Sequence, residues 1–247
     1  MRCLSVLNSN GRNYRKHRGS TLRLVITGLE YSGKTALTMK IVEMIEETTG
    51  KRSPYHDHYW PEIAHPPALT DEEEKYLLGL TPRLKEQIMR NNLEYHVRDT
   101  FYGPDHPDHI VVGAHIEDAV MGPSYFGYGG PGGPVPESGL IEDRSVVNAY
   151  LEAGLLERGP DTVLVHLKAS PDVIARRMRD SPHLNSVLQE SDIPRLLKRF
   201  EDEVRGSRIA HKIEIDTSNK VAEETMSELM EKMEPRLSEV DKQRFRL

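Results

Sequence analysis

The sequence predicts an α/β fold in which a parallel five-stranded sheet is covered by helices on both faces. Short runs of β-branched and apolar residues recur along the chain, and stretches with helical spacing of apolar residues separate them. Connections of this length imply parallel crossovers, which bury both faces of a sheet. A third observation is the pattern G-x-x-x-x-G-K-[ST], which stands between the first apolar run and the first helical stretch. Strands are expected at residues 22–27, near 55, at 109–116, at 162–167 and at 212–216.

The glycine-rich pattern runs from Gly28 to Thr35 and is typical of a loop that holds the phosphates of a nucleoside triphosphate. Its glycines allow the backbone to curl, so that successive N–H groups and the positive end of the following helix point at phosphate oxygens. Lys34 is expected to reach the β- and γ-phosphates, and the Thr35 hydroxyl to contact a magnesium ion that bridges them. The residues predicted to contact the triphosphate here are Gly28, Tyr31, Ser32, Gly33, Lys34, Thr35 and Ala36. The alternative, a chance glycine turn, requires neither the lysine nor the threonine.

Length and composition favour one soluble domain. At 247 residues the chain is long enough for a single large α/β domain, which we expect at 21–233. A disordered basic leader is expected at 1–20, with an organelle transit peptide or a misassigned start codon as its alternatives, and a frayed polar tail is expected at 234–247. No apolar run is long enough for a membrane helix, and the single cysteine, Cys3, suits a reducing compartment, so we expect a cytoplasmic protein. The net charge of −6 gives no general reason to bind nucleic acid, and the sequence leaves open whether the chain forms a homodimer.

Capping residues and apolar spacing predict the helices. The first helix is expected to close at Gly50. Thr70 and Glu73 form a capping-box pattern that opens a helical region broken near Pro82. The inward-facing residues of this region are expected to be Leu84, Ile88 and Leu93. Further helices are expected at about 142–157, 171–179, 192–205 and 219–232.

Two carboxylates, Glu117 and Asp118, end the strand expected at 109–116. Because ligands collect at the carboxyl ends of parallel strands, this pair is expected beside the phosphate loop. Either carboxylate there can hold magnesium through water or orient an attacking hydroxyl, whereas the alternative is a solvated acidic loop. Alternation along a strand predicts that Asp118 faces the loop as the catalytic and metal-binding residue, while Glu117 points to the opposite side.

Arginines follow the fourth predicted strand. Arg176 and Arg177 lie in a helix that leads into a polar stretch, and we expect a lid at about 176–192. Arginines on a lid can neutralise the charge of a phosphoryl group in transfer and exclude water. The alternative is that they only favour the helix C-terminus and solubility.

A loop rich in glycine, proline and tyrosine extends from Met121 to Pro134 and is too long for a simple connector. Its aromatic residues Tyr125, Phe126 and Tyr128 can stack on a base or pack the loop onto the core, and the sequence favours neither.

At this point the order of parts resembles the thymidylate kinase and deoxynucleoside kinase group of P-loop nucleotide kinases, from residue 22 to about 232. Gly28 to Thr35 is similar to the ATP loop of the family. The run from Pro160 through Arg177 is similar to the strand and helix that lead into its lid, and Ile213 to Ser218 to its last strand and adenine-contacting turn.

The resemblance implies a P-loop nucleotide-kinase fold, ATP and Mg²⁺ as cofactors, and a nucleotide or nucleoside as substrate. It implies that Lys34 and Arg177 serve catalysis, and that Arg176 and the turn residues Thr217 and Ser218 contact ATP. The residues that it places at the acceptor are Arg98, Ser124, Tyr125, Phe126 and Tyr128.

The chain also departs from the family pattern. An arginine is expected after the acidic residue of the third strand, but Glu117 is followed by Asp118, so the acceptor need not carry a phosphate. In the second-strand region, Asp57 is the candidate for the base that activates the acceptor. His56 and His58 flank it, but a His-x-His pattern without cysteine is a weak signal for a metal site.

We therefore predict an ATP-dependent phosphotransferase that moves the γ-phosphate to a nucleoside monophosphate or a nucleoside. A kinase of another small molecule is one alternative, and a nucleotide-dependent switch or ATPase module is the other. A guanine-specific Asn-Lys-x-Asp stretch would favour the switch, but Asn219-Lys220 is followed by Val221-Ala222.

Overall fold

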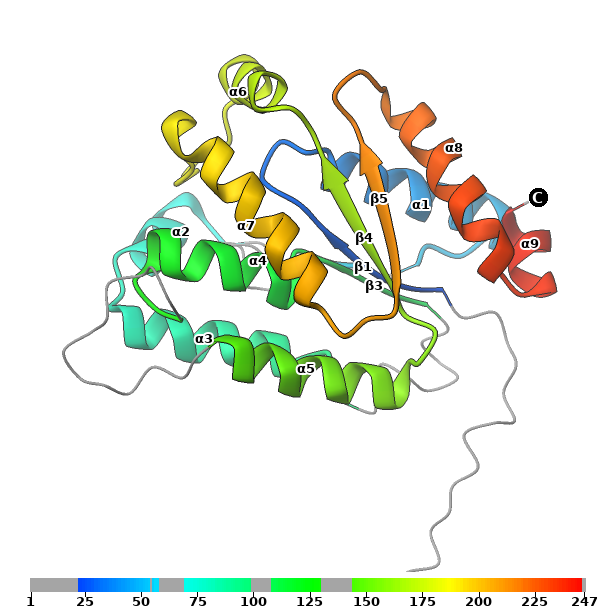
Figure 1. The fold of residues 1–247 in the computed structure, drawn as a ribbon, viewed down its shortest axis with the longest axis horizontal. Helices are drawn as coiled ribbons and strands as arrows, with labels where there is room; N and C mark the ends of the chain where they lie inside the picture. Colours follow the sequence, from blue (N-terminus) through cyan, green and yellow to red (C-terminus); the bar gives the residue numbers. More distant parts are fainter. Residues whose placement is uncertain (1–21, 54, 58–68, 99–107, 130–143, 246–247) are drawn as a thin grey trace, which may run out of the picture.

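The computed structural model describes residues 22–53, 55–57, 69–98, 108–129 and 144–245, so the predicted leader at 1–20 lies outside the described residues. At its centre, five parallel strands pair in the order β2-β3-β1-β4-β5 (Figure 1). The strands are β1 (Arg23–Thr27), β2 (Tyr55–Asp57), β3 (His109–Val112), β4 (Val163–Lys168) and β5 (His211–Asp216). The predicted parallel five-stranded sheet is confirmed.

Helices cover both faces of this sheet (Figure 1). One side carries α1 (Lys34–Thr49), α8 (Ala222–Met233) and α9 (Glu239–Phe245). The other side carries α3 (Pro82–Tyr95), α4 (Ala114–Met121), α5 (Arg144–Arg158) and α7 (Ile193–Gly206). Successive strand residues supply opposite cores, because Leu24 and Ile26 pack with α1 whereas Val25 packs with α4. Burial on both faces explains why the strands read as continuous apolar runs.

Helix ends follow the local signals in the sequence. Gly50 closes α1 in the left-handed conformation at φ 68°, and the Thr70–Glu73 capping box opens α2 (Asp71–Leu78). The helical region breaks before Pro82, as expected. Leu84, however, is 50% exposed, so its inward orientation was wrong. The buried residues of α3 are Lys85, Glu86, Met89 and Leu93, so the inward orientation of Leu93 is confirmed, and Ile88 is partly buried against the core.

The third strand is shorter than predicted, because β3 ends at Val112 and the chain turns sharply into α4. Gly113 and Ala114 make this turn with φ values of 75° and 52°. Every residue of α4 is buried, so its sequence shows no polar face that would distinguish a short buried helix from a strand. Glu117 and Asp118 therefore lie on a helix rather than beyond a strand end.

The C-terminal segment is folded rather than frayed as far as Phe245, contrary to expectation. A 3₁₀ turn at Glu234–Arg236 leads into α9, which packs against α1. Phe245 is buried in the core between α1 and the sheet, although the segment lacks the regular apolar spacing by which helices are recognised.

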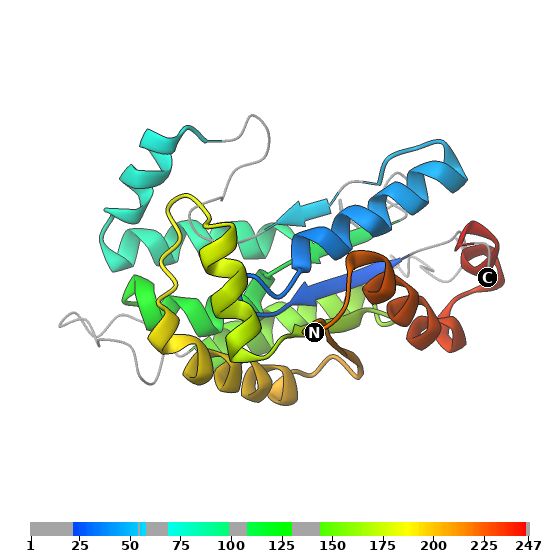
Figure 2. The same ribbon diagram turned by 90° about the horizontal axis from the view of Figure 1, so that it is seen from above.

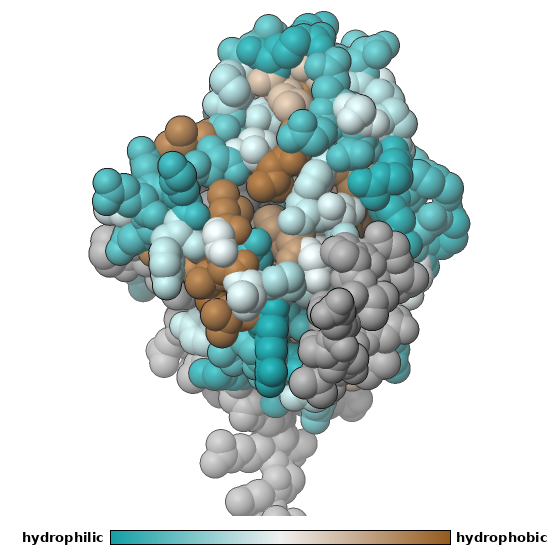
Figure 3. Space-filling view, turned by 90° about the vertical axis from the view of Figure 1, so that its left-hand side faces the viewer, coloured by the Kyte–Doolittle hydropathy of each residue, from teal (hydrophilic) through white to brown (hydrophobic). Residues whose placement is uncertain are grey.

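The remaining described elements surround the end of the sheet toward which the strands point. α6 (Pro171–Asp180) follows β4, and the segment after it crosses toward α2 (Figure 2). Figure 3 views the molecule from this side, where hydrophobic patches lie among hydrophilic side chains.

In the long loop after α4, Gly122–Phe126 form one π-helical turn, and residues 130–143 lie outside the described residues. None of the helices that the structure describes combines the length and apolar character needed to span a bilayer.

Candidate active site

A cleft of about 1200 Å³ opens at the carboxyl ends of the strands. Its walls are formed by the loop between β1 and α1, the end of β2, the first turn of α2, the C-terminal half of α3, Glu117 on α4, Arg177 and the segment after α6, and the turn after β5 with the start of α8. This is where parallel α/β sheets bind their ligands.

The glycine-rich loop forms the floor of the cleft. Gly28 adopts φ 149°, and a Cβ atom there would lie 2.3 Å from the Leu167 carbonyl oxygen, so only glycine fits. Gly33 adopts φ 96° as the N-cap of α1. The Lys34 ammonium group donates a hydrogen bond of 2.6 Å to the Gly28 carbonyl oxygen. The side chain of Lys34 thus links the end of the loop to its first residue.

The N-terminus of α1 is suited to an anion. No side chain caps this helix, so the first-turn N–H groups at Lys34, Thr35 and Ala36 keep their capacity to bind phosphate oxygens. Gly33 and these three residues line the cleft. The Thr35 hydroxyl is exposed there, and the carboxylates of Asp57 and Glu117 line the same wall. Hydroxyl and carboxylate oxygens are the donors that Mg²⁺ prefers, so these residues fit a triphosphate with its magnesium ion.

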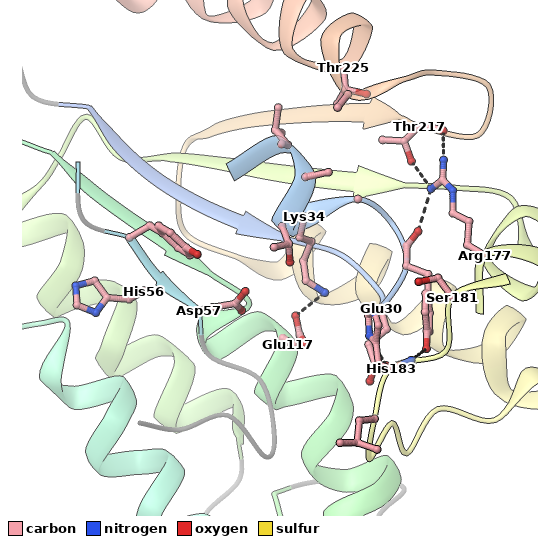
Figure 4. A pocket seen from close by; sticks show the side chains of 18 of the residues that line it. Glu30, Lys34, His56, Asp57, Glu117, Arg177, Ser181, His183, Thr217 and Thr225 are labelled. Atoms are coloured by element: carbon pink, nitrogen blue, oxygen red, sulfur yellow. Dashed lines mark hydrogen bonds and ion pairs between the residues drawn. The ribbon is translucent and has the colours of Figure 1, made fainter. Parts of the chain in front are cut away.

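Three carboxylates surround the lysine head (Figure 4). Glu117 lies with Oε2 3.0 Å from Lys34 Nζ, and Asp57 and Glu30 flank the pair. Burial raises the pKa of Glu117 to about 7, despite the opposing effect of Lys34. Burial also raises the pKa of Asp57, again against Lys34. Glu117 and Asp57 thus combine proximity to the loop with raised proton affinity, which is typical of acid–base groups at functional sites.

The predicted orientation of the Glu117–Asp118 pair was wrong. Asp118 accepts a hydrogen bond of 2.8 Å from the Tyr128 hydroxyl group, and it does not line the cleft. The strand argument placed the two side chains on opposite faces, but neighbouring residues of a helix diverge by only about 100°. On α4 this rotation turns Glu117 toward Lys34 and Asp118 toward Tyr128.

Arg177 joins the phosphate loop to the turn after β5. Its guanidinium group donates to the Tyr31 carbonyl oxygen at 2.9 Å and to the Thr217 carbonyl oxygen at 2.7 Å. The Thr217 hydroxyl in turn donates to the Ser32 carbonyl oxygen at 2.9 Å. Arg177, Tyr31 and Thr217 all line the cleft.

Two predicted ATP contacts in this region do not reach the cleft. Arg176 is exposed on the outside of α6, because the helix turns Arg177 inward instead. The Ser218 hydroxyl group donates to Asp216 Oδ1 at 2.5 Å and accepts from the Ser170 N–H at 2.8 Å. Ser218 thereby holds the turn after β5 rather than lining the cleft.

The segment expected to act as a lid lies over the phosphate loop. The His183 ring stacks on the Tyr31 ring at 4.3 Å, and its backbone N–H donates to the Tyr31 hydroxyl at 2.9 Å. Ser186 donates to Glu30 Oε2 at 2.8 Å, and Asn185 donates to Glu74 on α2. The segment is therefore attached both to the phosphate loop and to α2.

The acceptor residues predicted in the loop after α4 are packed away from the cleft. Tyr125 donates to Asp192 at 2.7 Å, and burial raises the pKa of Tyr125 to about 12. Ser124 donates to the Val120 carbonyl oxygen. Phe126 and Tyr128 are core residues, and Tyr128 is 1% exposed. These side chains serve packing, because Tyr125 contacts Asp192 just before α7, Phe126 lies beside Lys85 on α3, and Tyr128 contacts Asp118 on α4.

Other residues line the cleft instead, and among them Arg98 and Asp57 were predicted as acceptor residues. Arg98 lies over the Tyr95 ring, 5.7 Å from its centroid. Sequence reasoning missed Glu30, His183 and several polar or aromatic residues from β2 and α3. The latter are Tyr55, His56, Asn91, Asn92 and Tyr95. Glu30 could have been found from the sequence, because it occupies a variable position of the glycine-rich motif. The contact of His183 with Tyr31 spans 152 residues and has no local signal in the sequence. Among the residues that the structure describes, no group of three or more His, Cys, Asp or Glu could hold a metal ion.

Comparisons with known proteins agree with this geometry. No protein-family model matches the chain. A shikimate kinase from Bacillus cereus is 32% identical over 106 residues, a match that spans 39% of this chain and 63% of the length of that enzyme. A deoxyadenosine kinase from M. mycoides superposes with a TM-score of 0.53 and 12% identity, over 87% of this chain and 100% of that one. Thymidylate kinase from Candida albicans gives 0.52 and 12%, over 89% and 92% of the two chains. The resemblance stated from the sequence is thus confirmed, and the chain has the fold of the P-loop nucleoside and nucleotide kinases.

Proposed function

We propose that the protein is an ATP-dependent phosphotransferase that moves the γ-phosphate of ATP to a nucleoside or a nucleoside monophosphate. The observation that carries the proposal is the closed phosphate loop around Lys34, with Glu117 at 3.0 Å and Asp57 in the same cleft. A loop of this kind supplies the phosphate site, and the two carboxylates supply the acid–base chemistry that transfer to an acceptor needs. The single cysteine is in keeping with the cytoplasmic location expected for such an enzyme.

Each group has a distinct part in this reaction. Lys34 and the uncapped N–H groups of α1 bind the β- and γ-phosphates, and Arg177 orients the loop around them. The Thr35 hydroxyl and the Glu117 carboxylate would hold magnesium, which neutralises phosphate charge when it is bound. The segment from Ser181 to Gln189 closes over the loop and excludes water.

Asp57 is the group we propose as the base for a hydroxyl acceptor. It would accept the proton of the hydroxyl group while the oxygen forms a bond to the γ-phosphorus atom. The bond from this phosphorus to the β,γ-bridging oxygen breaks, and ADP leaves. The raised pKa of Asp57 favours this role, because a base is most effective when its pKa lies nearer the working pH.

The test is a coupled ADP-release assay with Mg²⁺-ATP and a panel of nucleosides and nucleoside monophosphates. Lys34→Ala should lower turnover by at least about 1000-fold, because it removes a phosphate ligand, and circular dichroism checks that the variant keeps its fold after Glu117 has lost its buried cation. Lys40→Ala is the matched control, since Lys40 lies on the same helix in exposed ion pairs with Glu43 and Glu223. Wild-type turnover in Lys34→Ala would refute the proposal.

A second candidate is a kinase of another small molecule that bears a hydroxyl group. The sequence similarity to shikimate kinase favours it, and shikimate therefore belongs in the same panel. Transfer to shikimate in preference to every nucleoside and nucleotide would establish this candidate instead.

A further inference from the structure

We propose that the acceptor of this protein carries no phosphate or carboxylate group and is an uncharged or positively charged alcohol. The inference rests on the proposed function and narrows its acceptor class. It follows from the charges that line the cleft on the acceptor side of Lys34.

Carboxylates dominate that side of the cleft. Asp57 and Glu117 lie at its depth beside the phosphate loop, and Glu30 lines it from the loop itself. Asp71 and Glu74 line it from the first turn of α2. An anionic acceptor would have to approach Glu30, Asp57, Asp71 and Glu74 as well as the Glu117–Lys34 pair. A neutral hydroxyl meets the same carboxylates as hydrogen-bond acceptors and, at Asp57, as a base.

Most of the cationic side chains that line the cleft already have partners. Lys34 is engaged by Glu117 and the Gly28 carbonyl oxygen, and Arg177 by Tyr31 and Thr217. Both belong to the phosphate site of ATP.

Lys220, also on the donor side, contacts Glu228 Oε2 at 2.6 Å and donates to the Asp216 carbonyl oxygen at 2.7 Å. Among the described residues that line the cleft, Arg98 is thus the cation left for the acceptor end, and it is exposed at the mouth over the Tyr95 ring.

The sequence of the internal segments outside the described residues points the same way. Residues 58–68, 99–107 and 130–143 contain no lysine or arginine. Their ionisable acidic residues are Glu62, Asp99, Asp105, Glu137, Glu142 and Asp143. None of these segments can therefore supply a lysine or arginine that would bind a phosphate dianion.

The remaining acceptor wall suits a neutral molecule. Tyr55 and Tyr95 offer aromatic faces, and Asn91 and Asn92 offer amide donors and acceptors. Such groups bind rings and hydroxyls without requiring a charge on the ligand.

The experiment uses the full-length chain and pairs of acceptors in which one member carries a phosphate or carboxylate group and the other does not. The pairs are thymidine with thymidine monophosphate, deoxyadenosine with deoxyadenosine monophosphate, and methyl shikimate with shikimate. We expect kcat/KM to be at least about tenfold higher for the uncharged member of any pair that is phosphorylated. Equal or better use of the charged member would overturn the inference, also if the basic residues at 1–20 were what bound that acceptor. This result would leave the proposed kinase activity standing. Absence of transfer to every member, with Mg²⁺-ATP shown to bind, would refute the proposed function as well.

A pair of variants tests the charge argument itself. Asp71→Asn removes one carboxylate from the cleft wall. It should lower the ratio of kcat/KM for the uncharged member to kcat/KM for the charged member by about twofold or more. Glu72→Gln is the matched control, because Glu72 is exposed on the same turn of α2 but does not line the cleft, and it should leave the preference unchanged. The same preference in all three proteins, or an equal change in both variants, would contradict an electrostatic origin.

Discussion

The side chain of Lys34 in the glycine-rich loop is held by two oxygen partners. Lys34 Nζ lies 2.6 Å from the Gly28 carbonyl oxygen and 3.0 Å from Glu117 Oε2. Both contacts are buried, so the side chain is ordered before a phosphate arrives. In the proposed reaction, an incoming triphosphate would replace a carboxylate partner of Lys34 rather than water, and would leave Glu117 beside the reacting groups.

The first prediction at the scale of residues distinguishes a role of Glu117 in the reaction from a structural role of Asp118. Glu117→Gln should lower kcat by about 10- to 100-fold without lowering the melting temperature at pH 7.5, because it removes a charge from the reacting centre and keeps the side-chain volume. Asp118→Ala should leave kcat within about threefold and lower the free energy of unfolding by about 1–3 kcal/mol, since it deprives the buried Tyr128 hydroxyl of its acceptor. Steady-state kinetics and denaturant unfolding measure both. A large loss of kcat in Asp118→Ala with near-normal Glu117→Gln would restore the role first predicted for Asp118.

The second residue-scale prediction concerns pH. Burial holds the pKa of Glu117 at about 7, above its ordinary value of 4.5, so the folded protein keeps a proton that the unfolded chain releases. The stability that this group contributes is therefore fully present below about pH 4.5 and is lost as the pH rises through 7. Between about pH 4.5 and a pH above 7, the free energy of unfolding of the wild type should fall by about 3 kcal/mol more than that of Glu117→Gln. Urea unfolding of both proteins at several pH values measures the difference, and a constant difference would contradict the assigned pKa.

At the scale of elements, Arg177 connects three parts of the chain that lie far apart in sequence. It extends from α6 to the phosphate loop and to the turn after β5. The segment after α6 adds contacts from His183 and Ser186 to the same loop. Any displacement of α6 is thus coupled to the shape of the phosphate site.

The matched pair Arg177→Ala and Arg176→Ala tests this coupling. Arg177→Ala should raise the KM for ATP by about tenfold and also lower kcat, because it loosens the phosphate loop as well as removing charge from the cleft. Arg176→Ala, one residue earlier and exposed, should stay within about twofold of the wild type on both constants. Similar defects in the two variants would mean that only the overall charge of the helix matters.

At the scale of the whole molecule, the C-terminal helix ties the end of the chain to the start of the sheet. Arg244 on α9 forms an ion pair with Asp108, with the two closest atoms 2.7 Å apart. Asp108 also accepts a hydrogen bond of 2.9 Å from the Leu22 N–H, just before β1. Phe245 adds apolar contact in the core beneath. The last helix therefore stabilises the strand that leads into the phosphate loop.

Arg244→Ala should lower the free energy of unfolding by about 3 kcal/mol, because it leaves the buried Asp108 carboxylate without its cation. Lys242→Ala is the control on the same helix, where the contact with Glu239 is solvent-exposed and should be worth less than about 1 kcal/mol. Denaturant unfolding followed by circular dichroism measures both. Equal stability of the two variants would show that α9 does not contribute to the folded core.

Local patterns in the sequence were sufficient for most of the fold. β1, the phosphate loop and α1 follow from the apolar run, the glycines and the lysine, because these signals act within about ten residues of one another. The same holds for the capping box of α2 and for the closure of α1 at Gly50. The strand at 109–116 was predicted too long, since a helix buried on all sides carries no periodic signal.

The glycine-rich loop could be predicted from the sequence alone, because it is a single contiguous segment, Gly28 to Thr35. The tertiary structure alone decided which other residues meet that segment. Glu117 rather than Asp118 faces Lys34 because of a turn at Gly113 and the rotation of one helix. Arg177 rather than Arg176 faces the cleft for the same kind of reason, and His183 lies on Tyr31 through packing of segments that no local pattern relates. Side-chain direction depends on a few tens of degrees of helix rotation, which only the packing of complete elements sets.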